Sequence, residues 1–226
     1  MNYKYILIDL DDTILDTRAN THNALKEMAK YVDFPFNDEQ IQYWYQMNDY
    51  LWKQLEEKQI SRQELMDSRF PNLFSHFNKK IDTTNINQQY FDVLNQQHEL
   101  MPGAKEILQE LNKTYRLFAA SNGTGDKQYS QTAGAKIDQY FEKIFLSEDI
   151  GFDKPDKKFF EAIENELQAK PEDFLMIGDS LSSDIAGANY SNIDSLWYNK
   201  NEINNKTDFK PTYEVTKLAD ICATIK

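Results

Sequence analysis

Hydrophobic and polar positions along this chain follow two patterns, and the first is a short apolar run that ends in polar residues. Tyr5–Ile8 is the first such run, and consecutive apolar residues are typical of a parallel strand buried on both faces. Further strands are predicted at 116–121, 143–146, 173–177 and 195–198. Helices are predicted between and after them, at 104–112, 126–132, 136–141, 156–167, 183–190 and 217–225. This alternation predicts right-handed βαβ units and a doubly wound α/β fold with a parallel sheet.

The second pattern is helical periodicity without any strand, from about residue 21 to residue 99. Helices are predicted at 18–32, 38–58, 61–69, 73–78 and 87–97. We therefore expect two domains: an α/β core formed by residues 1–16 and 100–226, and an inserted all-α cap domain at 17–99. The aromatic residues between 43 and 52 are expected to pack inside the cap, and some could instead line a stacking surface.

Composition narrows the class of protein. The 226 residues are 40% hydrophobic, which is typical of a globular chain with a sizeable core. The formal net charge of −12 disfavours binding to DNA, RNA or anionic membranes, although a metal and local cations can still attract a small anion. Cys222 is the single cysteine, so an internal disulfide is excluded. With no apolar stretch of membrane-spanning length and no room for a signal peptide before the first strand, we expect a cytoplasmic protein.

Candidate chemistry begins where the first strand ends, at Asp9-Leu10-Asp11-Asp12-Thr13. Burying carboxylates is costly unless they are paired, hydrogen-bonded or metal-bound, so a core strand that carries this cluster indicates a site. In an extended chain the side chains of Asp9 and Asp11 point the same way, with Cα atoms about 6.5–7 Å apart. This arrangement suits one carboxylate attacking a phosphorus atom while the other handles a proton. The simpler alternative is an acidic turn in which Thr13 or an aspartate caps the next helix.

Polar residues also stand at or after the ends of the other predicted strands. They are Ser121, Asn122 and Gly123, then Lys154 before Pro155, and finally Gly178-Asp179 with Asp184. Because the carboxyl ends of parallel strands meet at one edge of a sheet, we expect these side chains to converge. Two acidic strand ends repel each other without a cation, and oxygen ligands favour Mg²⁺ over zinc. Taken singly, Ser121-Asn122-Gly123 is also consistent with an ordinary turn, and Lys154 with a solvated lysine.

With these strand ends in this order, the sequence resembles the haloacid dehalogenase-like (HAD) hydrolase superfamily over essentially its whole length. The matching motifs are Asp9-Leu10-Asp11-Asp12-Thr13, Ser121, Lys154, and Gly178-Asp179 with Asp184. The resemblance implies a Rossmann-like core with a helical cap. It also implies phosphate chemistry, since the dehalogenases lack an acid/base carboxylate at the position of Asp11.

The resemblance further implies a role for each of these residues. Asp9 would be the nucleophile that forms an aspartyl-phosphate, and Asp11 would protonate the leaving oxygen and then activate water. Ser121 and Lys154 would hold the phosphoryl oxygens, and Thr13 would orient the loop by hydrogen bonding.

The resemblance implies two more sets of contacts. Asn122 and Gly123 would belong to the substrate-binding loop, where a backbone amide can approach an oxyanion. Mg²⁺ would be bound by Asp9, Asp179 and the backbone carbonyl of Asp11, with Asp184 anchoring the site through water or from behind the ligands.

Finer details are similar to the pyrimidine 5′-nucleotidase branch of the superfamily, the YjjG type. They are the segments Ser121-Asn122-Gly123, Lys154-Pro155-Asp156 and Trp197-Tyr198-Asn199. In the cap we expect Asn48, Trp52 and Arg69 to face the nucleoside. Trp52 could equally belong to the cap core, and Arg69 could be a solvated or a structural arginine.

The leading hypothesis is therefore a Mg²⁺-dependent phosphomonoesterase that hydrolyses nucleoside 5′-monophosphates, pyrimidine nucleotides preferred, through an aspartyl-phosphate intermediate. The alternatives are a sugar-phosphate or phosphoglycolate phosphatase, a phosphomutase of the same superfamily and, outside enzymes, a non-catalytic binding module. As a partner we expect a small phosphate monoester, with neither a nucleic acid polymer nor a membrane. The acidic surface is compatible with a monomer or a weak homodimer.

Overall fold

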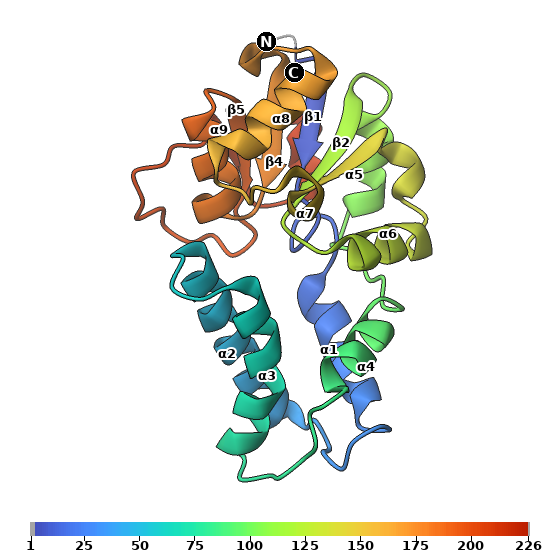
Figure 1. Ribbon diagram of the computed structural model, residues 1–226. Coiled ribbons are helices and arrows are strands. Elements are labelled where there is room, and N and C mark those ends of the chain that lie inside the picture. The colour runs from blue at the N-terminus through green and yellow to red at the C-terminus, as the bar shows by residue number, and fades with distance from the viewer. Residues whose placement is uncertain (1–2, 226) are drawn as a thin grey trace. The chain divides into compact units, whose positions relative to one another are not determined.

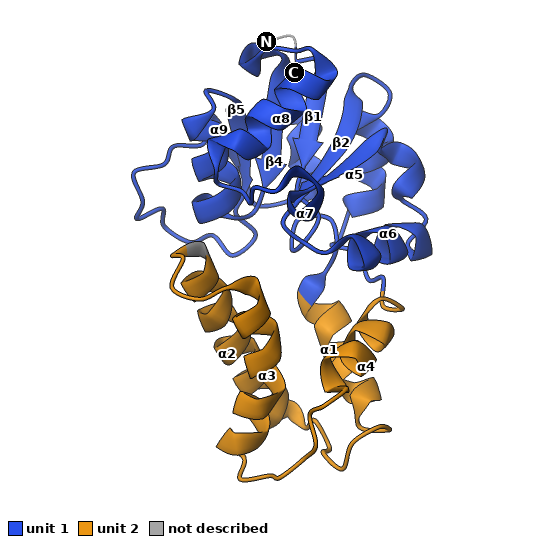
Figure 2. Cartoon of the chain, viewed as in Figure 1, with its two compact units in different colours: residues 1–17, 98–226 blue, residues 18–97 orange. Residues whose placement is uncertain are grey.

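The structure is a computed structural model that describes residues 3–225 (Figure 1). The chain divides into two compact units (Figure 2). Unit 1 joins the residues up to Thr17 with those from His98 onward, and unit 2 comprises Arg18–Gln97. Each unit has a hydrophobic core of its own, so the two are described in turn.

Unit 1 is built on a six-stranded sheet in which all neighbouring strands are parallel. The strands are β1 (Tyr5–Ile8), β2 (Arg116–Ser121), β3 (Lys143–Leu146), β4 (Phe174–Gly178), β5 (Asp194–Tyr198) and β6 (Tyr213–Val215). Their order is β3-β2-β1-β4-β5-β6, so the chain first builds outward from β1 on one side and then returns to build on the other. This reversal is the topology of a doubly wound sheet, and the predicted α/β fold is confirmed.

Alternate residues of each strand face opposite sides of the sheet, and helices cover both sides. On one side Ile6 packs with α5 (Ala104–Leu111). On the other side Leu7 packs with α8 (Lys157–Leu167). Burial on both faces explains why the central strands are continuous apolar runs rather than alternating ones.

The remaining elements of unit 1 are short. They are the helices α6 (Gly125–Gly134), α7 (Ser147–Ile150), α9 (Ala186–Tyr190) and α10 (Ile221–Thr224), the 3₁₀ turns Asp138–Tyr140, Pro171–Asp173 and Leu218–Asp220, and the π-helical turn Leu181–Ile185. The helices predicted at 136–141 and 217–225 are therefore corrected to shorter pieces. Strand β6 and helix α7 were not predicted, because three or four residues are too few to show a periodic pattern.

Unit 2 contains only helices and turns. The helices are α1 (Thr17–Met28), α2 (Asp38–Glu56), α3 (Arg62–His76) and α4 (Ile86–Leu94), of which α1 begins at the last residue of unit 1. Asn37 caps α2, because its side chain accepts from the Gln40 backbone N–H while the Gln40 side chain accepts from the Asn37 N–H. Ser61 and Glu64 form the same reciprocal cap at the start of α3.

Helix α3 differs from its prediction. Two helices were expected at 61–69 and 73–78, with a break near Pro71, whereas α3 runs through Pro71 without interruption. A proline inside a helix removes a backbone hydrogen bond and costs about 3 kcal/mol. Phe70, Leu73 and Phe74 are buried on either side of it, and their packing offsets this cost.

Two expectations about the surface concern longer segments. The polar segment 199–208 contains neither helix nor strand and is mostly exposed, as predicted for a surface loop. Among the helices of residues 3–225, none combines the length and the apolar character needed to cross a lipid bilayer.

Candidate active site

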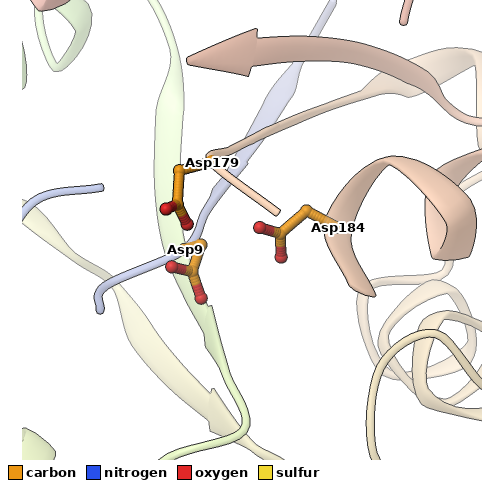
Figure 3. Close-up of side chains that lie close together, drawn as sticks. All are labelled: Asp9, Asp179 and Asp184. Carbon is orange, nitrogen blue, oxygen red and sulfur yellow. The ribbon is translucent and has the colours of Figure 1, made fainter. Parts of the chain in front are cut away.

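Asp9, Asp179 and Asp184 lie together at the carboxyl ends of two neighbouring strands (Figure 3). Asp9 directly follows β1, Asp179 directly follows β4, and the register pairs Ile8 with Ile177. One carboxylate oxygen from each of the three aspartates lies within 4.8 Å of the other two. The structure thus brings together the two acidic strand ends that are distant in the sequence.

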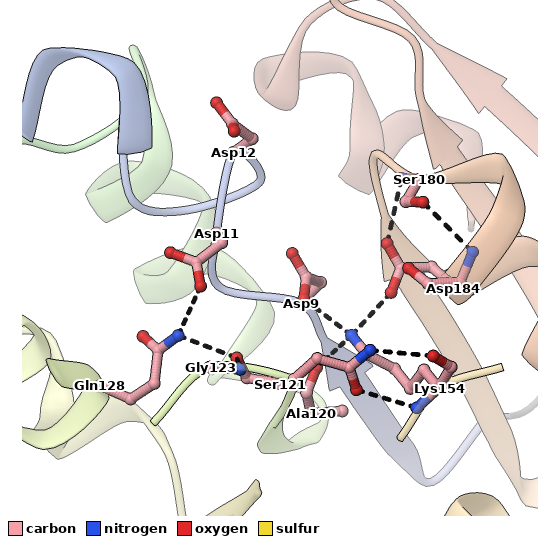
Figure 4. Close-up of polar contacts among 12 residues, drawn as sticks. Asp9, Asp11, Asp12, Ala120, Ser121, Gly123, Gln128, Lys154, Ser180 and Asp184 are labelled. Atoms are coloured by element: carbon pink, nitrogen blue, oxygen red, sulfur yellow. Dashed lines mark hydrogen bonds and ion pairs between the residues drawn. The ribbon is translucent and has the colours of Figure 1, made fainter. Parts of the chain in front are cut away.

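Lys154 is the buried cation that pairs with Asp9 and Asp184 (Figure 4). Its Nζ donates hydrogen bonds to Asp9 Oδ1 and Asp184 Oδ1 at 2.7 Å each, and to the backbone oxygen of Ala120 at 2.6 Å. Burial opposes the charge, but the carboxylates of Asp184 and Asp9 outweigh it and raise the pKa of Lys154. An ammonium group has three hydrogens, and all three have acceptors here. Lys154 therefore orients Asp9, whereas the predicted contact with phosphoryl oxygens would require one of these bonds to break.

The cluster keeps an excess of negative charge. Burial raises the pKa of Asp9 to about 7, helped by the charges of Asp184 and Asp11 and opposed by Lys154. Burial, together with the charge of Asp9, also raises the pKa of Asp179 well above its usual value. The three carboxyl groups have two ammonium groups near them, Lys154 and, 3.8 Å from Asp179 Oδ2, Lys200 Nζ, and all their donor atoms are oxygens. This donor set fits a hard divalent cation such as Mg²⁺, so the residues present suit the predicted metal.

Gly178 makes room for Asp184. A Cβ atom on Gly178 would lie 2.2 Å from Asp184 Oδ2, which no real side chain tolerates. Asp184 Oδ2 accepts from the Ser180 N–H at 3.1 Å, and Oδ1 accepts from Lys154. Both oxygens of Asp184 are thus engaged by the protein, an arrangement that suits a residue supporting the site from behind its ligands.

Asp11 has a different set of partners, drawn from α1 and from the first turns of α6. Its Oδ1 contacts Lys127 Nζ and accepts from Thr17 Oγ1 at 3.0 Å, and its Oδ2 accepts from Gln128 Nε2 at 2.6 Å. Burial acts to raise the pKa of Asp11, but the charge and hydrogen bond of Lys127 outweigh it, so the pKa lies below its usual value. Asp11 is therefore held as a carboxylate, the form that accepts a proton.

Thr17, rather than Thr13, supplies the hydroxyl that orients the loop after β1. The Thr13 side chain is buried, and its Oγ1 has no hydrogen-bond partner among residues 3–225. Thr17 Oγ1 accepts from the Asp12 N–H at 3.1 Å and donates to Asp11. Asp12 has a φ of 61°, and Lys200 Nζ donates to its backbone oxygen at 2.9 Å and to its Oδ1 at 2.8 Å. The predicted role of Thr13 is thus corrected, because Thr17 and Lys200 hold this loop.

Ser121 is the last residue of β2, and Asn122 and Gly123 follow it beside Lys154. Ser121 Oγ accepts from the Gly123 N–H and from Gln128 Nε2, both at 2.9 Å. Asn122 Nδ2 donates to the Lys154 backbone oxygen at 2.9 Å, and Asn122 Oδ1 accepts from the Lys154 N–H at 2.8 Å. The Asn122 side chain therefore fixes the segment that carries Lys154, and its predicted contact with substrate stays a prediction.

Arg69, predicted to face the substrate, is buried in unit 2 among aromatic rings. Its guanidinium carbon lies 5.5 Å from the ring centroid of Trp44, 5.4 Å from that of Tyr90 and 5.3 Å from that of Phe91. Its Nε and Nη2 have no hydrogen-bond partner among the described residues, and burial lowers its pKa. A buried cation with unused donors is costly without a ligand, so Arg69 is a candidate ligand-binding group.

The other two cap residues differ from each other. Asn48 is half-buried, and its Oδ1 is fully buried without a hydrogen-bond partner in the described part of the chain. Trp52 packs against the core of unit 2, and the guanidinium carbon of Arg62 lies 5.8 Å from its ring centroid. Asn48 thus keeps an acceptor for a ligand, whereas the contacts of Trp52 favour the alternative that it is part of the cap core.

The sequence did not indicate four residues that contact the predicted site. They are Thr17, Lys127, Gln128 and Lys200. None of them belongs to a recognisable motif, because the packing of α1, α6 and the loop after β5 brings them in. The one available signal is position, since Lys127 and Gln128 lie early in the helix that follows Ser121, and such helices begin at the ligand-binding edge of the sheet.

This chain is similar to known hydrolases. The model of the haloacid dehalogenase-like hydrolase family matches residues 3–192. Pyrimidine 5′-nucleotidase PynA of Streptococcus pneumoniae is 40% identical over 223 residues, which are 98% of this chain and 94% of that protein. Pyrimidine 5′-nucleotidase YjjG of Escherichia coli is 24% identical over 222 residues, covering 98% and 97% of the two chains. The crystal structure of the HAD-hydrolase YfnB of Bacillus subtilis, bound to magnesium, matches with a TM-score of 0.93 at 31% identity and covers 99% of this chain and 98% of that one.

Proposed function

This chain belongs to the haloacid dehalogenase-like hydrolase family, and we propose that it is a phosphomonoesterase acting on nucleoside 5′-monophosphates. Pyrimidine nucleotides are the preferred substrates in this proposal, since a relative that is 40% identical over almost the whole chain is a pyrimidine 5′-nucleotidase. The observation that carries the proposal is the convergence of Asp9, Asp179 and Asp184 around Lys154 at the carboxyl edge of the sheet.

Asp9 is the proposed nucleophile. Lys154 engages its Oδ1, so we assign Oδ2 as the atom that attacks phosphorus. The new Oδ2–P bond forms as the P–O bond to the nucleoside breaks, and Asp11, which enters this step protonated, gives its proton to the leaving oxygen. A water molecule then attacks the aspartyl-phosphate, Asp11 accepts its proton, and inorganic phosphate leaves with Asp9 restored. The structure holds Asp11 in the ionised form that the second half of this cycle uses.

Mg²⁺ is the proposed cofactor. Asp9, Asp179 and the backbone carbonyl of Asp11 would hold it, with Asp184 supporting the site. When bound, it supplies positive charge between the nucleophile and the phosphate, which otherwise repel each other. The magnesium in the related YfnB structure and the oxygen-only donor set support this choice of metal.

Phosphate release tests the proposal directly. The purified chain should release phosphate from UMP, dUMP and dTMP faster than from purine nucleotides, sugar phosphates or phosphoglycolate, with Mg²⁺ and not with excess chelator. Asp9→Asn should abolish release. A preference for a sugar phosphate would favour the alternative phosphatase, isomerisation without release would favour a mutase, and inactivity toward every ester would favour a binding module.

Substrate specificity is proposed to reside in unit 2, at Arg69 and Asn48. Their unpartnered donors and acceptor match the carbonyl and amide groups of a pyrimidine base. Replacing Arg69 or Asn48 with Ala should raise KM for UMP at least tenfold more than KM for p-nitrophenyl phosphate, which has no base. Trp52→Ala should affect both substrates alike if it belongs to the cap core. Equal effects from all three variants would assign all three to structure.

We propose that the protein works in the cytoplasm on a small phosphate monoester, without a nucleic acid polymer or a membrane as partner. The absence of a membrane-spanning helix in the described residues and the net charge of −12 support this setting. A monomer or weak homodimer is proposed, and light scattering across a concentration range measures it.

A further inference from the structure

Gln128 connects two parts of the proposed catalytic machinery that belong to different strand ends. Its side chain is fully buried in α6. Its Nε2 donates to Asp11 Oδ2 at 2.6 Å and to Ser121 Oγ at 2.9 Å (Figure 4). Because an ionised carboxylate only accepts hydrogen bonds, the amide nitrogen must face Asp11, and its two hydrogens serve the two partners. One amide group thus ties the acid/base carboxylate to the hydroxyl after β2.

The second step concerns the direction of the Ser121 hydroxyl. A hydroxyl oxygen accepts two hydrogen bonds and donates one. Ser121 Oγ already accepts from Gln128 Nε2 and from the Gly123 N–H, each at 2.9 Å. Its acceptor positions are therefore filled by protein, and its hydrogen is left to donate. A donor is what an oxygen of a phosphoryl group requires.

The third step explains the glycine in Ser121-Asn122-Gly123. A Cβ atom on Gly123 would lie 2.0 Å from Gln128 Nε2 and 3.1 Å from Asp11 Oδ2. The amide of Gln128 therefore passes through the space that any other side chain at 123 would occupy. Gly123 and Gln128 form one arrangement, since the glycine provides the passage that the amide uses.

We propose that Gln128 is a positioning residue, whose amide makes the Ser121 hydroxyl an obligatory donor to the phosphoryl group and fixes Asp11 relative to it. This inference rests on the proposed phosphatase function and adds a residue that lies outside the four strand-end motifs. The neutral amide is suited to the task, because it donates in two directions without adding a charge beside the phosphate.

A double-mutant cycle tests whether Gln128 acts through Ser121. Gln128→Leu keeps the approximate size of the side chain and removes both donors. It should lower kcat/KM for UMP by about 10–100-fold, less than the roughly 10²–10³-fold cost of losing an oxyanion donor itself, because Ser121 keeps its hydroxyl. In a protein that already carries Ser121→Ala, Gln128→Leu should lower kcat/KM by a factor less than a third as large as in the wild type. The hydroxyl that Gln128 orients is then already absent.

Inorganic phosphate, used as a competitive inhibitor with Mg²⁺ present, reports on the phosphoryl site without a leaving group. Its Ki should rise about tenfold in Gln128→Leu and in Ser121→Ala, and no further in the double variant. Gly123→Ala should give the same two changes with the amide still present, which guards against a folding defect peculiar to Gln128→Leu. Gln131→Leu is the matched control, as Gln131 is another fully buried glutamine of α6, and it should leave both quantities within about threefold.

The outcomes separate the inference from the function on which it rests. Independent, multiplying losses for Gln128→Leu and Ser121→Ala, or an unchanged Ki for phosphate, would assign Gln128 to structure while the phosphatase stands. A Gln131→Leu variant as impaired as Gln128→Leu would do the same. A wild-type protein that releases no phosphate from any ester would overturn the proposed function and this inference with it.

Discussion

Asp9 and Asp11 are two positions apart in the sequence, yet their surroundings shift their pKa values in opposite directions. Asp9 is buried beside Asp184 and its pKa rises to about 7, whereas Asp11 contacts Lys127 and its pKa falls. Lys154 donates to only one carboxylate oxygen of Asp9, Oδ1. Asp9 is thereby oriented for attack through its other oxygen, and Asp11 is available for proton transfer.

The acid/base role of Asp11 predicts a dependence on the leaving group. Asp11→Asn should lower kcat/KM for UMP by about 10²–10⁴-fold, because the nucleoside oxygen leaves only with a proton. The loss for p-nitrophenyl phosphate should be at least tenfold smaller, since nitrophenolate leaves without one. Asp12→Asn is the control, because that carboxylate contacts Lys200, and it should change both substrates by the same factor. Equal losses in Asp11→Asn would contradict the role.

Of the substitutions considered, replacing Lys154 is expected to lower the free energy of unfolding the most. Lys154→Met would leave Asp9 and Asp184 buried without their counterion, and removing one partner of a buried pair costs about 3–5 kcal/mol. Lys143→Met is the control, since its pair with Glu166 is half exposed and such pairs contribute about 0–1 kcal/mol. Urea unfolding at pH 7 without added metal measures both. Similar free energies of unfolding for the two variants would show that Lys154 is not the essential counterion.

At the scale of elements, the strands were predictable because burial on both faces leaves a continuous apolar run. The predicted strands at 116–121 and 143–146 agree with β2 and β3. Strand β6 was not predicted, because its three residues at the sheet edge do not form a continuous apolar run. The prediction of two helices in place of α3 was wrong. The backbone chemistry of Pro71 favours a break, but the packing of Phe70 and Phe74 keeps the helix continuous. Tertiary packing overrode local preference there.

The residues of the candidate site also fall into those that the sequence could predict and those that it could not. Asp9 and Asp179 were predictable, because each directly follows a strand, where the topology of a parallel sheet gathers side chains. Lys154 was predictable because it precedes Pro155 in the segment that leads into a helix. Gln128 and Lys127 were not, because their approach to Asp11 depends on how α6 packs, and sequence spacing does not encode that.

Helix α3 makes its own prediction through Pro71. Pro71→Ala restores a backbone N–H inside the helix and should raise the free energy of unfolding by about 1–2 kcal/mol, after allowing for the greater freedom of the unfolded chain. Pro211→Ala is the control, since that proline lies outside helices and strands, and it should not stabilise the protein. Thermal unfolding compares the two, and a lower melting temperature for Pro71→Ala would show that the proline fits the helix without loss.

For the whole molecule, the acidic cluster links stability to pH. The folded protein holds a proton on Asp9 more tightly than the unfolded chain does, because the pKa rises from 3.8 to about 7 on folding. The stability that this group contributes is therefore fully present below about pH 4 and is lost as the pH rises through 7. Asp9→Asn removes this contribution, so the difference in melting temperature between wild type and variant isolates it from all other carboxylates.

The same linkage predicts how Mg²⁺ stabilises the fold. The ion binds carboxylates, so protons compete with it at Asp9 and Asp179, and its affinity should rise steeply from pH 5.5 to pH 8. At a concentration about 100 times its Kd, a ligand bound only by the folded state adds about 2.7 kcal/mol of stability. Differential scanning fluorimetry at fixed Mg²⁺ should therefore show a melting-temperature gain at pH 8 that shrinks at pH 5.5 and disappears in Asp179→Asn. A melting-temperature gain that is the same at both pH values, or that persists in Asp179→Asn, would place the ion elsewhere on the acidic surface. Mg²⁺ would then not be the ligand that Asp9 and Asp179 bind together.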